Sequence, residues 1–288
     1  MRIGNVTIQD TFAEAWDLEV ARLVLTAISE DVALGAAHQF VGAAGSSELG
    51  SAINGGIERT AAPQETPDGR PGVFVSLTLP PDRRADFVEE LSLRLVLATL
   101  IPTCAVYDAM VPEAETETID LYGPTADRWQ GYEETRAVGG RPVCVVPTTT
   151  GTFIYQKTIS LSTSGTDGHF VCYAKAEPSA VLAVKAAKDA IASVDGVCPM
   201  GFGLEQIFRE LDYVPALKER IEDSRVPEGV SSILNLLMFG ASPILMREGM
   251  TVAIEAAARV DGVQLIGAMN FGGAFGRHQY HLHELLAA

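Results

Sequence analysis

The feature that most restricts the fold is a strand–turn–helix pattern that occurs three times along the chain. Each copy begins with an apolar run, passes through a Pro-marked turn and continues as an amphipathic helical segment. The copies cover residues 72–100, 169–197 and 231–263. The second and third copies end alike, on "ASVDGV" and "ARVDGV", where Gly196 and Gly262 are placed to terminate helices.

A further apolar run follows each of the last two copies, so strand–helix–strand occurs twice over residues 169–270. This order is typical of a split βαβ (ferredoxin-like) sandwich. Residues 1–110 are expected to hold a related unit. We therefore predict an α+β protein with two similar lobes.

Three local patterns lead to more specific expectations. Asp10 or Thr11 is placed to cap a helix, and Glu14 would complete a capping box. A β-hairpin is predicted to turn at residues 166–168. The segment 204–221 has acids and bases spaced as on the surface of an amphipathic helix.

Composition excludes several classes of function. The net charge of −16 argues against non-specific binding to nucleic acid or to an anionic membrane surface, both of which need a basic face. The apolar stretches are too short or too interrupted to span a bilayer, and the first residues lack the pattern of a secretory signal. The four cysteines are far apart, without zinc spacing, as expected of buried thiols in a reducing compartment. A cytoplasmic protein is expected.

Two loops carry candidate site residues. The turn "ETPDGRPG" presents Asp68 and Arg70, either as structural partners or as groups that bind a substrate carboxylate or phosphate. The loop at 221–232 gathers Glu222, Asp223 and Glu228 just before a strand. These acids would lie in a solvated turn, or burial would turn one of them into a general acid.

The C-terminal stretch "NFGGAFGRHQYHLHEL" combines a Gly-rich run with three histidines. The Gly-rich run lacks the spacing of a dinucleotide-binding loop. In an extended strand His281 and His283 would share one face, but no third metal ligand is marked. We expect these histidines to make hydrogen bonds rather than to hold a metal.

Six motifs occur in a fixed order along the chain: "DTFAEAW", "GGIERT", "TPDGRPG", "YDAM", "IEDSRVPEGV" and "NFGGAFGRHQYHLHEL". Together they resemble the formylmethanofuran:tetrahydromethanopterin formyltransferase family, over nearly the full chain. Enzymes of that family move a formyl group in one-carbon metabolism. The resemblance implies two ferredoxin-like lobes, with the C-terminal strand returning to the N-terminal lobe. The N-terminal lobe would comprise residues 1–145 plus 270–288, and the C-terminal lobe residues 146–269.

The resemblance also implies partners and cofactors. Formylmethanofuran and tetrahydromethanopterin would be substrates, with no metal and no tightly bound cofactor. The protein would be a homo-oligomer, such as a homotetramer, or a subunit of a larger complex.

Formyl transfer itself requires an oxyanion donor and a proton donor. Family members are thought to use a glutamate as proton donor. By motif position Glu228 is the first candidate and Glu58 the second. Asp68, Arg70, Asp223 and Ser224 would bind substrate.

The chain departs from the family pattern at "CPMGFG" and in the shorter segment 204–221. These changes leave an alternative open, a divergent homologue without catalysis that binds a pterin- or methanofuran-like ligand or assembles a complex. A metal-dependent hydrolase that uses His281 and His283 is a third hypothesis.

Overall fold

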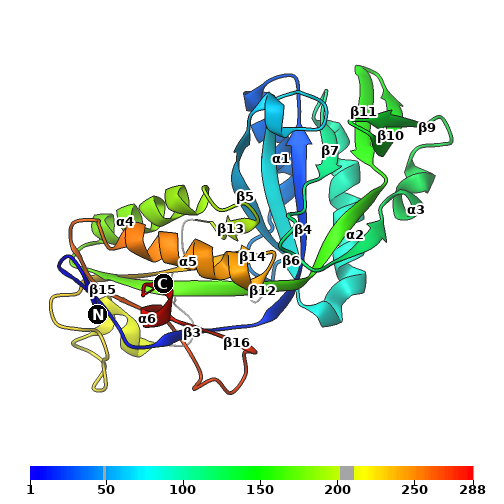
Figure 1. Cartoon of the computed structure of the whole chain (residues 1–288). Coiled ribbons are helices and arrows are strands. Elements are labelled where there is room, and N and C mark those ends of the chain that lie inside the picture. Colours follow the sequence, from blue (N-terminus) through cyan, green and yellow to red (C-terminus); the bar gives the residue numbers. More distant parts are fainter. Residues whose placement is uncertain (48–49, 202–210, 288) are drawn as a thin grey trace. The chain divides into compact units, whose positions relative to one another are not determined.

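The chain folds into two units, and both of its ends belong to the same one (Figure 1). The computed structural model describes residues 1–47, 50–201 and 211–287. Unit 1 comprises residues 1–17 and 166–288, and unit 2 is the continuous segment 18–165.

The sheet of unit 1 is built on the second half of the long strand β12 (Thr158–Ala174). This half pairs antiparallel with β14 (Ser232–Gly240) on one side and with β15 (Val263–Gly267) on the other. β13 (Val197–Pro199) extends the sheet beyond β14, and β2 (Val6–Ile8) pairs parallel with β15.

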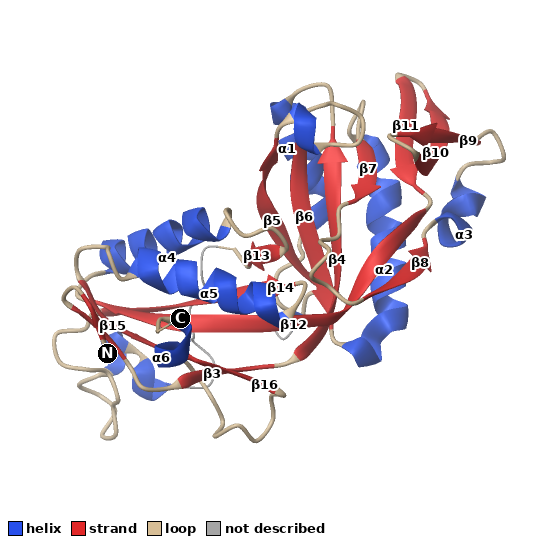
Figure 2. Cartoon of the chain, viewed as in Figure 1, coloured by secondary structure: helices blue, strands red, loops and turns tan. Residues whose placement is uncertain are grey.

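Two helices cover the sheet of unit 1 (Figure 2). α4 (Glu177–Ile191) and α5 (Pro243–Ala257) pack against each other and against β14. α5 begins where the Ser242 side chain accepts a hydrogen bond from the Leu245 N–H. Gly196 and Gly262 follow the helices with φ of +82° and +91°, a conformation that favours glycine in the turn before the next strand.

A two-stranded ribbon joins the chain ends within unit 1. β16 (His278–His281) pairs antiparallel with β3 (Phe12–Ala15), and the short helix α6 (Leu282–Leu285) follows. β1 (Arg2–Ile3) forms a small hairpin with β2.

In unit 2, β4 (Asp17–Thr26) lies between β6 (Gly72–Leu79) and β7 (Ala105–Asp108) and is antiparallel to both. β5 (Asn54–Ala61) pairs with β6, and β11 (Gly151–Gln156) pairs with β7. Unit 2 also contains β8 (Thr116–Asp120), β9 (Glu134–Val138) and β10 (Arg141–Thr148), and β8 pairs with the first half of β12.

The core of unit 2 lies between its sheet and two helices, α1 (Glu30–Val41) and α2 (Arg84–Leu97). Phe40 and Phe87 are fully buried there. The short helix α3 (Tyr122–Thr125) and six 3-10 turns complete the described elements. These turns are Pro63–Glu65, Pro81–Arg83, Ala98–Leu100, Ala126–Arg128, Leu211–Tyr213 and Pro215–Leu217.

The described residues thus form a mixed α+β structure with six α-helices, as expected for the fold class. The expected lobe boundaries differ from the observed units. Residues 1–17 lie with 166–269 because β2 pairs with β15, and residues 270–288 join the same unit because β16 pairs with β3 and α6 contacts α5. Among the described residues, no helix is long and apolar enough to cross a membrane.

Three local predictions were wrong. The segment 10–26 forms β3 and β4 rather than a helix, and the first helix begins only at Glu30, after the cap residue Ser29. β12 continues straight through residues 166–168, since neighbouring strands pair along both of its halves. Residues 211–217 form two 3-10 turns, while the first part of the predicted surface helix, 204–210, lies outside the described residues.

Candidate functional sites

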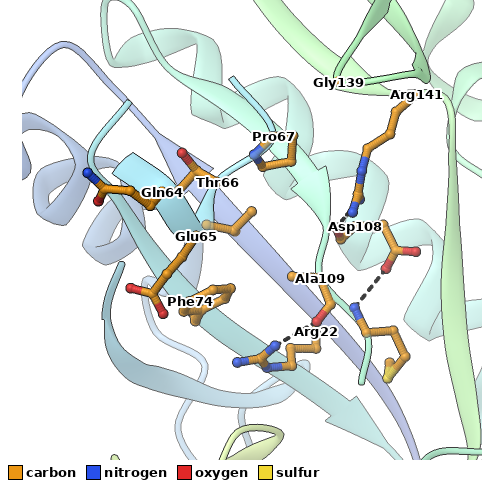
Figure 3. A pocket seen from close by; sticks show the side chains of 12 residues that line it. Arg22, Gln64, Glu65, Thr66, Pro67, Phe74, Asp108, Ala109, Gly139 and Arg141 are labelled. Atoms are coloured by element: carbon orange, nitrogen blue, oxygen red, sulfur yellow. Dashed lines mark hydrogen bonds between the residues drawn. The ribbon is translucent and has the colours of Figure 1, made fainter. Parts of the chain in front are cut away.

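Each unit contains a polar cavity. The cavity of unit 2 has a volume of about 500 Å³ and lies where two of the sequence motifs meet, "TPDGRPG" and "YDAM" (Figure 3). Its wall combines Arg22 and Phe74 from the sheet with the 64–67 turn, the end of β7 and the β9–β10 hairpin. It has the size of an ordinary small-molecule pocket.

A β-bulge in β5 directs two charged side chains beside this cavity. Ile57 pairs with Val75 and Arg59 pairs with Phe74, so Glu58 is an extra residue. Such an insertion re-aims the side chains around it, and bulges are common next to active sites.

Glu58 holds a buried arginine at the cavity. Its Oε2 atom accepts a hydrogen bond from Arg22 Nε at 2.9 Å, and its Oε1 atom accepts one from Ser76 Oγ at 2.6 Å. Arg22 also donates to the Ala109 carbonyl at 2.6 Å. Both carboxylate oxygens of Glu58 are thus engaged within the protein. The geometry is that of a group that positions Arg22.

The Phe74 ring packs against the guanidinium groups of two arginines. The guanidinium carbons of Arg22 and Arg59 lie 4.2 and 4.5 Å from the centre of its ring. Arg59 also forms an ion pair with Glu65 at 2.8 Å. These cation–π contacts favour the observed positions of both arginines.

Asp68 and Arg70 belong to a closed network in the turn that precedes β6. Asp68 accepts hydrogen bonds from Arg70 Nε, Thr26 Oγ1 and Tyr107 Oη at 2.7–3.1 Å. Burial, with the adjacent Asp68 charge, raises the pKa of Tyr107 and keeps it a donor. Arg70 donates to the Thr103 carbonyl at 2.7 Å. This arrangement favours the structural interpretation of the turn, and neither Asp68 nor Arg70 lines the cavity.

The cavity of unit 1 has a volume of about 530 Å³ and is lined by aromatic and amide groups. Tyr173 and Tyr213 form part of its wall, and Asn270 is held by hydrogen bonds to Thr11 Oγ1 and the Phe12 carbonyl at 3.0 and 3.1 Å. Arg225 also lines it.

The predicted residues of the 221–232 loop lie at this cavity without lining it. Arg225 and Pro227 line the cavity, while Glu228 and Asp223 are exposed on the same loop. Ser224 Oγ donates to the Asp212 carbonyl at 3.2 Å and so helps to shape the loop. The structure therefore brings Glu228, Asp223 and Ser224 together in unit 1, whereas Glu58, Asp68 and Arg70 are in unit 2.

The Gly-rich run is folded around a carboxylate of the chain itself. Glu14 is fully buried in β3, and its two oxygens accept hydrogen bonds from four backbone N–H groups at 2.6–3.0 Å. The donors are Phe271, Gly273, Phe275 and Gly276. Burial opposes ionisation, but the four donors outweigh it and lower the pKa of Glu14 to about 2. The backbone N–H groups of the Gly-rich run therefore bind the Glu14 carboxylate.

Two of the C-terminal histidines make hydrogen bonds to the N-terminal segment of unit 1, and the third packs on a ring. His278 Nε2 lies 2.8 Å from Asp17 Oδ1, and His283 Nε2 lies 2.9 Å from the Ile8 carbonyl. The His281 ring packs on Phe12, with 5.1 Å between ring centres. Within the described residues no group of three potential ligands is arranged to hold a metal ion.

Sequence reasoning missed Arg22, Asp108 and Arg141 at the cavity of unit 2. One signal was present for Arg22, which interrupts the apolar run of residues 18–25 with a charge. Asp108 belongs to the "YDAM" motif but was given no role. Arg141 follows an inconspicuous Gly-Gly turn, and no local pattern marks it.

The chain is similar to known proteins over nearly its full length. The family described as "Formylmethanofuran-tetrahydromethanopterin formyltransferase" matches residues 1–148, and its proximal lobe matches residues 209–285. The formyltransferases of Methanothermus fervidus and Methanopyrus kandleri are each 34% identical to the chain, over 99% of this chain and 100% of each enzyme.

Two solved structures share the fold. The formyltransferase from Methanosarcina barkeri has a TM-score of 0.90 and 31% identity, over 99% of this chain and 100% of that one. A chain of the formyltransferase/hydrolase complex from Methylorubrum extorquens, solved with methylofuran, has a TM-score of 0.87 at 24% identity, over 99% of this chain and 98% of that one. On the family match and the full-length identity, this chain belongs to the formylmethanofuran–tetrahydromethanopterin formyltransferase family.

Proposed function

We propose that the protein transfers a formyl group between formylmethanofuran and N5 of tetrahydromethanopterin. The observation that carries this proposal is the full-length similarity to enzymes with this activity, at 34% identity over 99% of the chain. The match covers both units, and each unit contains a cavity in which a substrate could be held.

The reaction defines what the site must supply. The pterin amine attacks the formamide carbon, the carbonyl oxygen becomes an oxyanion, and the C–N bond to the methanofuran amine then breaks. The departing amine takes a proton, and the pterin nitrogen loses one. Hydrogen-bond donors aimed at the oxyanion, together with tight positioning of both substrates, provide most of the rate enhancement in such reactions.

Glu228 is our candidate proton donor. It is exposed beside Pro227, which lines the cavity of unit 1, so a substrate in that cavity would approach its carboxyl group. Asp223 and Ser224 on the same loop are proposed to bind substrate. Glu58 is the weaker candidate because both of its oxygens accept hydrogen bonds from Arg22 and Ser76. Asp68 and Arg70 would support the cavity of unit 2 from the adjoining turn.

The assembly and location of the protein are part of the same proposal. We propose a cytoplasmic homo-oligomer, such as a homotetramer, or a subunit of a larger complex, with no tightly bound cofactor. Its two units would be related ferredoxin-like lobes. The strand–helix–strand order around α4 and α5 in unit 1 supports this description. The alternative of a non-catalytic homologue depends on the altered stretch "CPMGFG" and the shorter segment 204–221, of which residues 202–210 lie outside the described residues.

The test is a direct assay. Purified protein is mixed with formylmethanofuran and tetrahydromethanopterin, and formylated pterin is followed. We expect turnover in the wild type and a fall of about 100-fold or more in Glu228→Gln, as for the loss of a general acid. Glu222→Gln, an exposed acid on the same loop, is the matched control and should keep full activity. Absence of turnover in the wild type would contradict the proposed function; full activity of Glu228→Gln would exclude Glu228 as the donor.

A further inference from the structure

One arginine of the cavity in unit 2 keeps hydrogen-bond donors that the described part of the chain does not use. Arg141 Nη1 donates to the Asp108 carbonyl at 2.5 Å and to Gln156 Oε1 at 3.1 Å. Its Nε and Nη2 atoms make no hydrogen bond or ion pair with any described residue. We propose that this cavity is a binding site for an oxyanion, a carboxylate or a phosphate, that Arg141 receives through these two atoms.

The acids around the cavity do not compete for Arg141. Asp108 accepts hydrogen bonds from the Ser160 N–H and Oγ at 3.1 and 2.8 Å and from the Met110 N–H at 3.2 Å. Glu65 accepts from the Ala62 N–H at 2.8 Å and is paired with Arg59. Because each of these carboxylates has other partners, the Nε and Nη2 donors of Arg141 stay available to a ligand.

A second arginine, Arg22, also lines the cavity. The Arg22 side chain is only 4% exposed, yet it lines the cavity and donates to the Ala109 carbonyl, next to the carbonyl that Arg141 holds. Figure 3 shows the two guanidinium groups on either side of the Asp108–Ala109 segment. A buried charge pair is costly to desolvate and contributes little net stability, so a role in binding is consistent with its place at the cavity.

The hairpin that carries Arg141 is fixed in place. Gly139 and Gly140 have φ of +56° and +77°, as a tight two-residue β-turn requires. A Cβ atom on Gly139 would lie 2.8 Å from the Pro67 carbonyl oxygen, so the hairpin rests directly on the 64–67 turn. Arg141 therefore meets a ligand from a prearranged position, which reduces the entropy lost on binding.

The chemistry of the ligand follows from the donors. A guanidinium edge of two parallel N–H groups matches two oxygens of a carboxylate or a phosphate. Under the proposed function, this oxyanion would belong to one of the two substrates, at a point remote from the transferred formyl group. This assignment rests on the proposed function, whereas anion binding itself does not.

A binding experiment tests the site without the reaction. Glutarate and inorganic phosphate are titrated separately into the full-length protein, and heat of binding and thermal unfolding are measured. Arg141→Gln should weaken binding of the preferred probe by about tenfold or more, the cost of a charge-assisted hydrogen bond. Arg141→Lys keeps the charge and should weaken it less. Arg136→Gln, on the same hairpin but exposed and paired with Glu134, is the matched control and should bind as the wild type does.

Each outcome decides the proposal. Binding of glutarate alone assigns a carboxylate, and binding of phosphate alone assigns a phosphate. If neither probe binds the wild type at millimolar concentration, or if Arg141→Gln binds equally well, the site is refuted. In the formyl-transfer assay, Arg141→Gln should raise the KM of one substrate about tenfold and change kcat far less. Absence of turnover in the wild type would refute the proposed function. The anion site would then be tested by the binding experiment alone.

Discussion

The carboxylate of Glu14 organises a loop that is distant in sequence. Four N–H groups of residues 271–276 point at it, and a Cβ atom on Gly276 would lie 2.6 Å from Glu14 Cγ. Only glycine fits there. The loop in turn carries Phe271 and Phe275 at the surface, with 5.5 Å between their ring centres.

We predict that Glu14 makes stability depend on pH in the acid range. Because the folded state lowers the pKa of Glu14 from 4.5 to about 2, its stabilisation is complete above pH 4.5 and is lost as the pH falls toward 2. Glu14→Gln should be less stable than the wild type near neutral pH, and this difference should shrink across that window. Urea unfolding at a series of pH values measures it. Glu248→Gln, an exposed acid of α5, should show no such convergence. A difference that stays constant with pH would contradict the role of the carboxylate charge.

The Arg22–Glu58 pair supports a second prediction at this scale. Both side chains are almost fully buried, so Glu58→Ala should strand the Arg22 charge and cost about 3–5 kcal/mol. The double replacement Arg22→Met with Glu58→Leu should recover most of this loss, because no unpaired charge is then buried. Equilibrium unfolding of the wild type, Arg22→Met, Glu58→Leu and the double replacement gives the coupling. The exposed Arg136–Glu134 pair is the control and should couple by about 0–1 kcal/mol. Additive losses at Arg22 and Glu58 would show that the pair is not a unit.

Little of this residue-level detail could be predicted from the sequence. Glu14 has the spacing of a capping residue, and nothing local indicates that its partners lie some 260 positions away. The Glu58–Arg22 contact depends on a bulge, which no residue pattern in β5 marks. Asp68 and Arg70 were recognised as a turn, because Pro-Asp-Gly chemistry is local.

At the scale of elements, two helical glycines show how packing decides the effect of one methyl group. Gly35 in α1 is exposed, and a Cβ atom there would have no neighbour within 4 Å. Gly249 in α5 is buried, and a Cβ atom there would lie 2.8 Å from Val197 Cγ1 in β13. The Val197 side chain is β-branched and has few rotamers with which to yield.

We predict opposite signs for the same substitution. Gly35→Ala should stabilise the protein by about 0.5–1 kcal/mol through helix propensity. Gly249→Ala should destabilise it by about 1–3 kcal/mol, since overpacking against β13 outweighs that gain. Val197→Ala in the Gly249→Ala background should relieve the overlap. Chemical unfolding compares the variants, and a stabilising Gly249→Ala would refute the close packing of α5 on β13.

Elements were predictable where the chain repeats a clear period. The strands and helices of residues 169–263 follow the expected order, since polar and apolar positions alternate with helical spacing in α4 and α5. The expected helix at residues 10–26 failed because a buried strand and a buried helix both appear as an apolar run. The run at 18–25 is flanked by β6 and β7, and this tertiary pairing decides its conformation.

At the scale of the whole molecule, the expected boundary at residue 145 was wrong for a physical reason. The chain passes between units within continuous strands, at Asp17–Leu18 and Gly165–Thr166, rather than in loops with turn chemistry. Sequence signals for a linker are therefore missing at both points. Unit 2 is an insertion between the two segments that build unit 1.

Unit 1 consequently depends on the chain's last residues. Tyr280, Leu282 and Leu285 are almost fully buried, and the Leu282 N–H donates to the Thr11 carbonyl at 2.9 Å. Thr251 of α5 donates to the Leu285 carbonyl at 3.1 Å. These contacts bind β3 and α5 to the C-terminal segment, which closes unit 1.

We predict that a stop before His278 loosens unit 1 and spares unit 2. Removing β16 leaves the β3 groups that pair with it without partners and uncovers part of α5, so amide exchange in β3 and in α5 should accelerate by about tenfold or more. Exchange in β5 and β6 should be unchanged, because their pairing and the core beneath them lie wholly within unit 2. A stop after Leu286 retains the strand and α6 and is the control. Peptide-resolved hydrogen exchange measures amide exchange in both units of one sample. Equal acceleration in β5 and β6 would mean that the two units unfold cooperatively.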